Sequence, residues 1–300
     1  MPTITVLEIR DAVYAWLPNI MHISKIPDNK LSKKIEAYIS QITKLHSDAT
    51  ITRLHSMFSM VNSAANGCMY YQDFLSYYDE QAKNLYENIC QGNQTWQKKV
   101  KAKLEQSVLD ISDKNVTNPS NPAFLNYIAE ILYAATIIPL AQDGGYEFLG
   151  FDVSMNNGKD ADLQFRRIDD GMLIYFDNLS IHGVDISKVD QSEDLYNYLK
   201  TKLDQKIASK TSGLVKENEN YIINGAVSEF HVAPILWNES CDMLPHKDAF
   251  QQFENEKIVS GLFVALKPQY LSNGRFYFSI EKIKDILQHW EEQLTTIDND

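Results

Sequence analysis

Residues 161–181, ADLQFRRIDDGMLIYFDNLSI, contain two strand-like segments that meet at the dipeptide Asp170-Gly171. Apolar and polar side chains alternate on both sides of this dipeptide, which is typical of β-strands with one buried face. Asp-Gly is a preferred sequence for a two-residue hairpin loop. We therefore predict an antiparallel hairpin in which Asp169 pairs with Met172.

This register assigns each side chain of the hairpin to one of two faces. The apolar face, expected on the core, holds Leu163, Phe165, Met172, Ile174 and Phe176. The outer face holds Asp162, Gln164, Arg166, Tyr175, Asp177 and Leu179. Asp162 and Asp177 are predicted to be diagonal neighbours there, roughly 5.5–8 Å apart at the backbone. Such a pair can share a magnesium ion, which prefers oxygen ligands; without an ion, both are ordinary polar residues of an exposed face.

Helical periodicity precedes the hairpin. In the first ~115 residues, apolar side chains recur every three to four positions, which predicts a helical bundle. The expected helices cover residues 31–45, 51–61, 70–86 and 96–111. The tyrosine-rich face between Tyr70 and Tyr86 is expected in the bundle core or on a partner surface, with base stacking as the alternative. The segment Asn115–Pro122 contains two Asn-Pro pairs and is the best domain boundary. We expect an all-helical domain over residues 1–117 and an α/β domain over residues 118–300.

Strands and helices are mixed in the second domain. The first expected element is a helix from Pro122 that carries Glu130, followed by strands over Tyr146–Val153, Ala161–Ile168 and Met172–Ile181. Next come a helix over Leu195–Ile207, a strand over Val227–Trp237 and a short helix over Ala249–Phe253. The last expected elements are strands over Ile258–Leu266 and Arg275–Phe278 and a helix over Ile280–Trp290. The predicted fold class is therefore α+β or α/β, with an N-terminal helical bundle followed by a mixed-sheet domain.

The order of an acid-bearing helix, a three-stranded meander, a helix and a strand over residues 122–237 resembles the PD-(D/E)xK nuclease superfamily, which has the restriction-endonuclease-like fold. The matching positions are Glu130 on the leading helix, Asp162 on the second strand and Asp177 on the third. The resemblance implies that these three carboxylates hold magnesium. It also implies that Asp162 and Asp177 act in catalysis together with a lysine that polarises the attacking water.

The sequence departs from the family pattern at three positions. Leu179 stands where the family has its lysine, Ala161 where it has a proline, and Asp177 where it usually has glutamate. Lys159, in the preceding turn, is the candidate replacement for the catalytic lysine. The departures favour a degenerate nuclease-like protein that acts mainly through binding, in a regulatory or partner-docking role, with catalysis weakened or lost. The alternatives are an active magnesium-dependent nuclease on DNA or RNA and an acidic inhibitor of a basic or nucleic-acid-binding partner.

Charge is divided unevenly along this chain of 300 residues with a net charge of −12. Residues 1–120 carry 13 basic and 12 acidic side chains, whereas residues 121–300 carry 15 and 28. The acidic second half would repel a DNA duplex. If a nucleic acid binds, the favoured contact is the basic run Lys98, Lys99, Lys101 and Lys103; the alternative is that this run is a solvated helix face. A protein partner is the main expectation.

Cysteine usage and hydropathy indicate the compartment. Cys68, Cys90 and Cys241 are far apart, which predicts reduced thiols in the cytoplasm. The longest apolar run, Ile131–Leu140, has about half the length that spans a bilayer, so no membrane association is expected. GxGxxG, GxxxxGK[ST], GxSxG and HExxH do not occur, which disfavours dinucleotide, P-loop, serine-hydrolase and zinc-protease chemistry.

Overall fold

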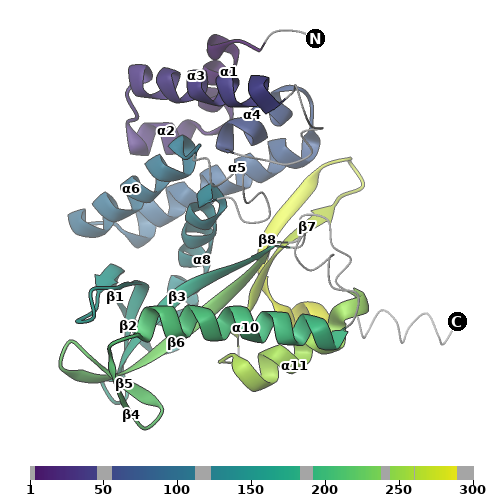
Figure 1. Ribbon diagram of the computed structural model, residues 1–300. Coiled ribbons are helices and arrows are strands. Elements are labelled where there is room, and N and C mark those ends of the chain that lie inside the picture. The colour runs from purple at the N-terminus through teal and green to yellow at the C-terminus, as the bar shows by residue number, and fades with distance from the viewer. Residues whose placement is uncertain are drawn as a thin grey trace, which may run out of the picture. The chain divides into compact units, whose positions relative to one another are not determined.

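The computed structural model describes residues 4–45, 56–111, 123–182, 192–237, 244–259 and 261–288 (Figure 1). It is a mixed α+β protein. The chain forms two compact units, one of residues 1–135 with 268–278, and the other of residues 136–267 with 279–300. We call them the helical unit and the sheet unit. The boundary expected near residue 117 lies outside the described residues.

The helical unit consists mainly of helices, as the periodicity of the first ~115 residues predicts, and its first two helices, before residue 28, were not individually expected. The helices are α1 (Val6–Trp16), α2 (Pro18–Ser24), α3 (Asp28–Leu45), α4 (Met57–Ala65), α5 (Met69–Asn84), a π-helical turn η1 (Leu85–Ile89), α6 (Gln94–Leu109) and the first part of α8 (Ala123–Asp143). Helix α1 begins with a capping box, because Thr5 and Glu8 each accept a hydrogen bond from the other's backbone. Residues 51–55 of the expected second helix lie outside the described part.

The tyrosine-rich face of α5 contributes to the core of the helical unit. Tyr78 is fully buried, and its hydroxyl donates to Ser107 Oγ at 2.8 Å. Phe74 and Tyr70 pack edge-on against Phe278, which belongs to the same unit. The prediction of a core face over Tyr70–Tyr86 is therefore confirmed for Phe74 and Tyr78.

The sheet unit is organised around a mixed sheet in the order β1-β2-β3-β6-β5-β4, with β7 also paired to β6 and to β8; the connected ends of β7 and β8, residues 268–278, belong to the helical unit. The strands are β1 (Tyr146–Ser154), β2 (Asp160–Arg167), β3 (Leu173–His182), β4 (Val215–Glu217), β5 (Asn220–Ile223), β6 (Ala226–Trp237), β7 (Val264–Tyr270) and β8 (Phe276–Lys282). β1, β2 and β3 form an antiparallel meander, and β6 runs parallel to both β3 and β7.

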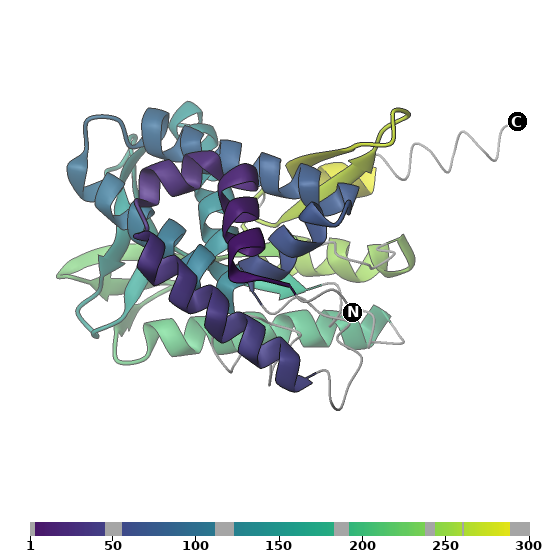
Figure 2. The same ribbon diagram turned by 90° about the horizontal axis from the view of Figure 1, so that it is seen from above.

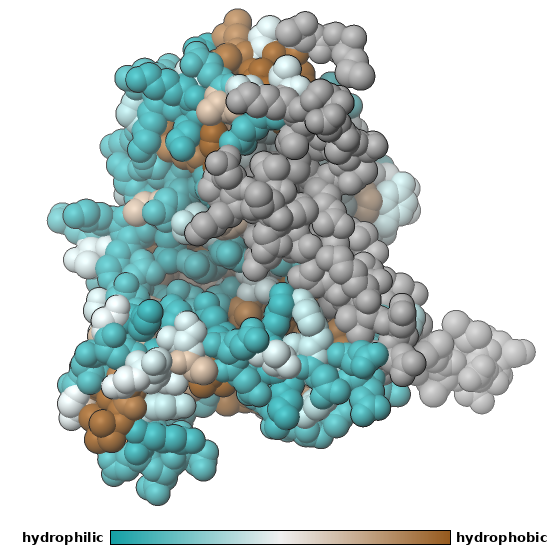
Figure 3. All heavy atoms as spheres, in the orientation of Figure 1, coloured by the Kyte–Doolittle hydropathy of each residue, from teal (hydrophilic) through white to brown (hydrophobic). Residues whose placement is uncertain are grey.

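Helices α10 (Ser192–Thr211) and α11 (Lys247–Lys257) lie side by side along one face of this sheet (Figures 1 and 2). Their apolar side chains form one cluster with the sheet; its members include Leu195, Leu199, Leu203, Phe250, Phe253, Tyr175, Phe230 and Val232. The side of these helices that faces the viewer in Figure 3 is mainly hydrophilic. Both helices therefore bury one apolar side against the sheet.

Several predicted boundaries in the second half are wrong. The strand expected from Ile258 begins only at Val264, because Ile258 N donates to Glu254 O as the C-cap of α11 and Leu262 N donates to Val259 O in a turn. Ile280 lies in β8 and not in the last helix, which begins after Lys282. The hairpin of β4 and β5 was not predicted, since each strand has only three or four residues.

Helix α8 is long and apolar enough to cross a membrane, although 61% of its apolar window is buried within the protein. Among the described residues it is the one helix that meets this length and hydropathy test. Cys68 and Cys90 are free thiols, and Cys241 lies outside the described residues.

Candidate functional site

The β2–β3 hairpin has a longer loop than the sequence predicts. Its pairs include Phe165↔Ile174 and Leu163↔Phe176, and Arg167 N donates to Met172 O at 2.9 Å. The loop therefore has four residues, 168–171, and the predicted two-residue loop is wrong. The physical reason is Asp170, whose carboxylate accepts from Met172 N at 2.9 Å and from the Arg167 guanidinium at 3.0 Å.

The extra two loop residues leave the predicted faces intact. Because side chains alternate with a period of two, a shift of two residues keeps each side chain on its face. The same shift makes position 162 the direct partner of position 177, one step beyond the pair Leu163↔Phe176. Asp162 Oδ2 also accepts from the backbone N–H of Asn178 at 2.7 Å. Asp162 and Asp177 are thus opposite neighbours and not diagonal ones.

The face that carries both aspartates is covered and not exposed. Helix α10 packs on it, and Asp177 has no exposed surface, while Asp162 is half-buried. The expectation of a solvated outer face is therefore wrong at Asp177. Burying a carboxylate is costly unless cations or hydrogen bonds compensate its charge.

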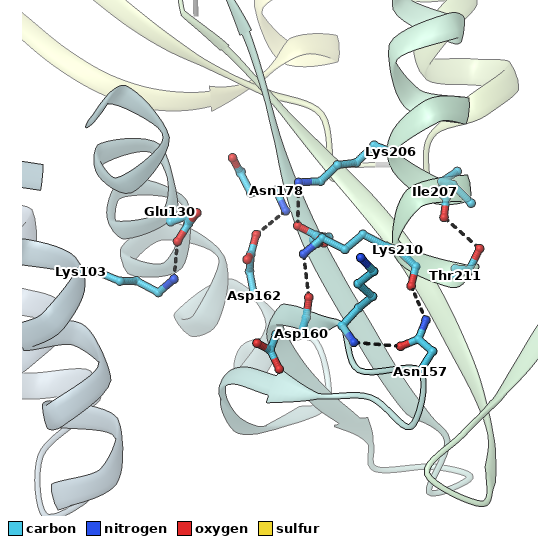
Figure 4. A network of polar contacts seen from close by, with 12 residues as sticks. Lys103, Glu130, Asn157, Asp160, Asp162, Asn178, Lys206, Ile207, Lys210 and Thr211 are labelled. Atoms are coloured by element: carbon cyan, nitrogen blue, oxygen red, sulfur yellow. Dashed lines mark hydrogen bonds and ion pairs between the residues drawn. The ribbon is translucent and has the colours of Figure 1, made fainter. Parts of the chain in front are cut away.

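Two lysines of α10 supply the compensating charge (Figure 4). Lys206 Nζ lies 3.0 Å from Asp177 Oδ1, and Lys210 Nζ lies 2.5 Å from Asp177 Oδ2. Lys210 also donates to the backbone oxygen of Asp160 at 2.7 Å. Neither carboxylate oxygen of Asp177 has a contact with full hydrogen-bond geometry among the described residues. The lysines therefore act on Asp177 as ion-pair partners.

The sequence contains a signal for these lysines that our prediction missed. Leu195, Leu199 and Leu203 form the buried stripe of α10, and they are spaced by four residues. Lys206 and Lys210 continue this stripe at spacings of three and four. A charged residue on the apolar stripe of a helix predicts a buried acidic partner, since an unpaired buried charge is rarely tolerated.

Burial and the nearby Asp162 charge raise the pKa of Asp177 to about 6, while Lys206 and Lys210 act in the opposite direction. Burial is the largest of these effects, because it disfavours the ionised form. A carboxyl group with this pKa is mostly ionised at neutral pH. It takes up a proton in mildly acidic solution.

A third aspartate, Asp152 on β1, joins the pair and was also missed. It lies between the register pairs Phe151↔Leu163 and Val153↔Ala161, so it is opposite Asp162. A carboxylate oxygen of Asp152 lies within 4.8 Å of one of Asp162. The backbone of Asp152 has φ 45°, a conformation that costs free energy for residues other than glycine. Pairing β1 with β2 in the sequence would have revealed this row of three aspartates.

The remaining predicted site residues are Glu130 and Lys159. Glu130 belongs to the helical unit, where it forms an ion pair with Lys103, the last lysine of the basic run. The Lys103 side chain is only 12% exposed, so this lysine is not part of a solvated basic face. Lys159 lies exposed in the turn between β1 and β2, and its ammonium makes no ion pair within the described part of the chain.

No protein-family model, curated protein or solved structure matches this chain. Its candidate site consists of Asp152, Asp162 and Asp177 on three adjacent strands, and of Lys206 and Lys210 on the helix that covers them.

Proposed function

We propose that this protein is a divalent-metal-dependent phosphodiesterase on nucleic acid, with its centre at Asp162 and Asp177. The observation that carries the proposal is the pair of lysines that α10 presents to buried Asp177. Leu179 stands at the family's lysine position, which favours the loss of catalysis. Lys206 and Lys210 bring two ammonium groups to Asp177 from α10, and these can supply the positive charge that Leu179 lacks.

The order of elements supports the same proposal. Helix α8, the meander β1–β2–β3, helix α10 and strand β6 follow one another, and β6 lies beside β3 in a parallel orientation. This is the order that the resemblance to the restriction-endonuclease-like fold implies. The small β4–β5 hairpin is then an insertion between α10 and β6, and β7 extends the sheet beyond β6.

The donor set fits a hard divalent cation. Asp162 and Asp177 offer carboxylate oxygens, which magnesium and manganese prefer. The oxygens of Asp177 lack hydrogen bonds within the described residues, so their lone pairs remain for a cation once a lysine moves aside. Asp152 is a further donor close to Asp162. When bound, such an ion polarises the phosphoryl oxygen and lowers the pKa of a water molecule.

The chain's own groups perform the remaining tasks. The Asn178 N–H fixes the orientation of the Asp162 carboxylate. An ammonium group released from Asp177, that of Lys206 or Lys210, would stabilise the negative charge that develops on phosphate. Lys206 and Lys210 also hold hydrogens that can be donated to a phosphate oxygen or to water. Because there are two lysines, one can remain in its ion pair with Asp177 while the other interacts with the phosphate.

The test is a cleavage assay on plasmid, single-stranded DNA and RNA with magnesium or manganese. We expect cleavage by the wild-type protein and its loss in Asp162→Asn and Asp177→Asn. Lys206→Met and Lys210→Met should each reduce the rate by about 10- to 1000-fold. Lys200→Met, at a half-buried position on the same helix, is the matched control and should retain activity. Folded wild-type protein that cleaves none of the three substrates would overturn the proposal.

Binding without catalysis is the second candidate, and one observation favours it. Asp177 is fully buried, and each of its oxygens already has an ammonium partner. If the ion pairs persist, the cluster is a structural link between α10 and β3, and the protein acts through a partner. Millimolar magnesium would then leave both the melting temperature and the lysine contacts unchanged. Calorimetric titration with magnesium separates the two candidates.

A further inference from the structure

A cavity lies on the face of the sheet opposite to the aspartate site. It has a volume of about 270 Å³ and lies entirely within the sheet unit. Phe176 contributes to its wall, whereas the next residue, Asp177, points to the α10 face. The cavity is therefore distinct from the aspartate site, and ligand binding there is independent of the proposed function.

The walls of this cavity are largely apolar. Ile137 and Leu140 of α8 form one side, and Phe165, Ile174 and Phe176 of the sheet form another. Its volume is near the lower limit of small-molecule sites, which are mostly apolar with a few convergent polar groups. The occupant is therefore small and has an apolar body.

Arg167, Glu229 and His231 of the lining interact with one another, so that the charges of Arg167 and Glu229 compensate each other. Arg167 Nη2 donates to Glu229 Oε1 at 2.7 Å, and Glu229 Oε2 lies 2.9 Å from His231 Nε2. Because a carboxylate only accepts hydrogen bonds, Nε2 of His231 must carry the hydrogen. Burial opposes ionisation of Glu229, but hydrogen bonds from His231 and Arg167 hold the pKa of Glu229 below its usual value. Glu229 thus stays ionised and is neutralised locally.

The remaining charge in the lining is the ammonium of Lys282. No ion pair of Lys282 occurs among the described residues, and its side chain is half-buried. The Lys282 side chain lies beside Gly261: a Cβ at position 261 would be in ordinary van der Waals contact with it, 3.4 Å from Cε and 3.6 Å from Nζ. The charged side chains of the lining, Arg167, Glu229 and Lys282, sum to one positive charge with neutral histidine.

We propose that this cavity binds a small apolar monocarboxylate, whose carboxylate pairs with Lys282 and whose body lies between α8 and the phenylalanines of the sheet. A cation is disfavoured by the positive lining. A dianion lacks a second free cation among the described lining residues, because Arg167 is already engaged by Glu229 and Asp170.

The test compares phenylacetate with its neutral counterpart 2-phenylacetamide, using saturation-transfer NMR and titration on the full chain. We expect both to bind weakly, about millimolar for ligands of this size, with phenylacetate binding more tightly. In Lys282→Met the affinity for phenylacetate should fall about two- to fivefold, as for a partly exposed ion pair, while that for the amide stays unchanged. Lys257→Met removes an equal charge at an exposed position of α11 and should change neither affinity.

A variant that fills the cavity tests whether the ligand binds there. Ala141→Leu adds bulk to the lining at a half-buried position of α8 and should abolish binding of both compounds without changing the melting temperature by more than a few degrees. Equal affinity for phenylacetate and 2-phenylacetamide would contradict the proposal that the ligand is a monocarboxylate. Unchanged phenylacetate binding in Lys282→Met, or in folded Ala141→Leu, would overturn the assigned site, and so would the absence of any signal with wild-type protein.

Discussion

Lys210 reaches Asp177 across the space between α10 and β3, with Nζ 2.5 Å from Oδ2. Lys206, one helical turn earlier, reaches the other oxygen at 3.0 Å. The two lysines are 21% and 29% exposed, whereas Asp177 is fully buried. The buried carboxylate of Asp177 therefore holds two successive turns of α10 on the sheet. The same carboxylate is one of the proposed metal ligands.

The stability of the protein should depend on pH through Asp177. Its pKa is raised to about 6 in the folded protein, so between about pH 4 and 6 the folded state binds a proton that the unfolded state lacks. The contribution of this group to the free energy of unfolding is therefore largest below pH 4 and is lost as the pH rises to 6. Asp177→Asn removes the titration. Wild-type stability relative to this variant should fall by about 1–3 kcal/mol between pH 4 and pH 7, measured by urea unfolding.

Asp204→Asn, at an exposed position of the same helix, is the control for this experiment and should show no such change relative to wild type. A difference between wild type and Asp177→Asn that stays constant from pH 4 to pH 7 would contradict the raised pKa.

Lys206 and Lys210 should be coupled energetically. Each single change to methionine leaves Asp177 with one cation, and we expect a loss of about 1–2 kcal/mol of unfolding free energy. The double variant leaves a buried carboxylate without an ion pair, so its pKa should rise further and the loss should differ from the sum of the singles. A double-mutant cycle at pH 5 and at pH 8 measures this coupling. Additive losses at both pH values would show that the lysines do not share Asp177.

The sequence predicted the faces of the hairpin but not its register. Alternation at Asp162, Phe165 and Ile174 depends only on strand periodicity, which survives a shift of two residues. The register depends on the side chain of Asp170, which stabilises a four-residue loop that the dipeptide Asp170-Gly171 does not reveal.

The lysine partners could not be assigned from periodicity alone. Lys206 follows Asp177 by almost thirty residues, and its contact with that acid exists only because α10 packs on the sheet. The buried stripe of α10 indicated which helix face lies inward. Which strand residue that face meets is a property of tertiary packing, and local sequence does not encode it.

Arg275 should stabilise the helical unit through Asp73. Its Nε donates to Asp73 Oδ1 at 2.8 Å, and Phe276 N donates to Oδ2 at 2.7 Å. The Arg275 hydrogen bond is the main cause that holds the pKa of Asp73 below its usual value. Asp73→Asn should therefore cost about 0.5–1.5 kcal/mol at pH 7 and less at pH 2, because the contribution of a carboxylate with a lowered pKa is lost as the pH falls through that pKa. Thermal unfolding at both pH values measures this, and an equal cost at both would exclude the ionic contribution.

Substitutions at Asp152 can distinguish the effect of its strained backbone from a functional role of its carboxylate. Its φ of 45° suits glycine, costs free energy for most residues and is least costly for asparagine and aspartate. Asp152→Gly should therefore keep the fold within about 1 kcal/mol, whereas Asp152→Val should lose about 1–2 kcal/mol, because a β-branched residue is strained there. Urea unfolding of the three proteins measures these differences.

Asp152→Gly also removes a carboxylate near Asp162 without disturbing the strand. If Asp152 contributes to the cation site, magnesium affinity should fall about 5- to 50-fold in this variant, and cleavage should need correspondingly more metal. Asp152→Asn keeps an oxygen donor of similar shape and should lose less affinity than glycine. A glycine variant with wild-type stability and wild-type magnesium affinity would restrict the site to Asp162 and Asp177, and the strained backbone of Asp152 would then need an explanation other than metal binding.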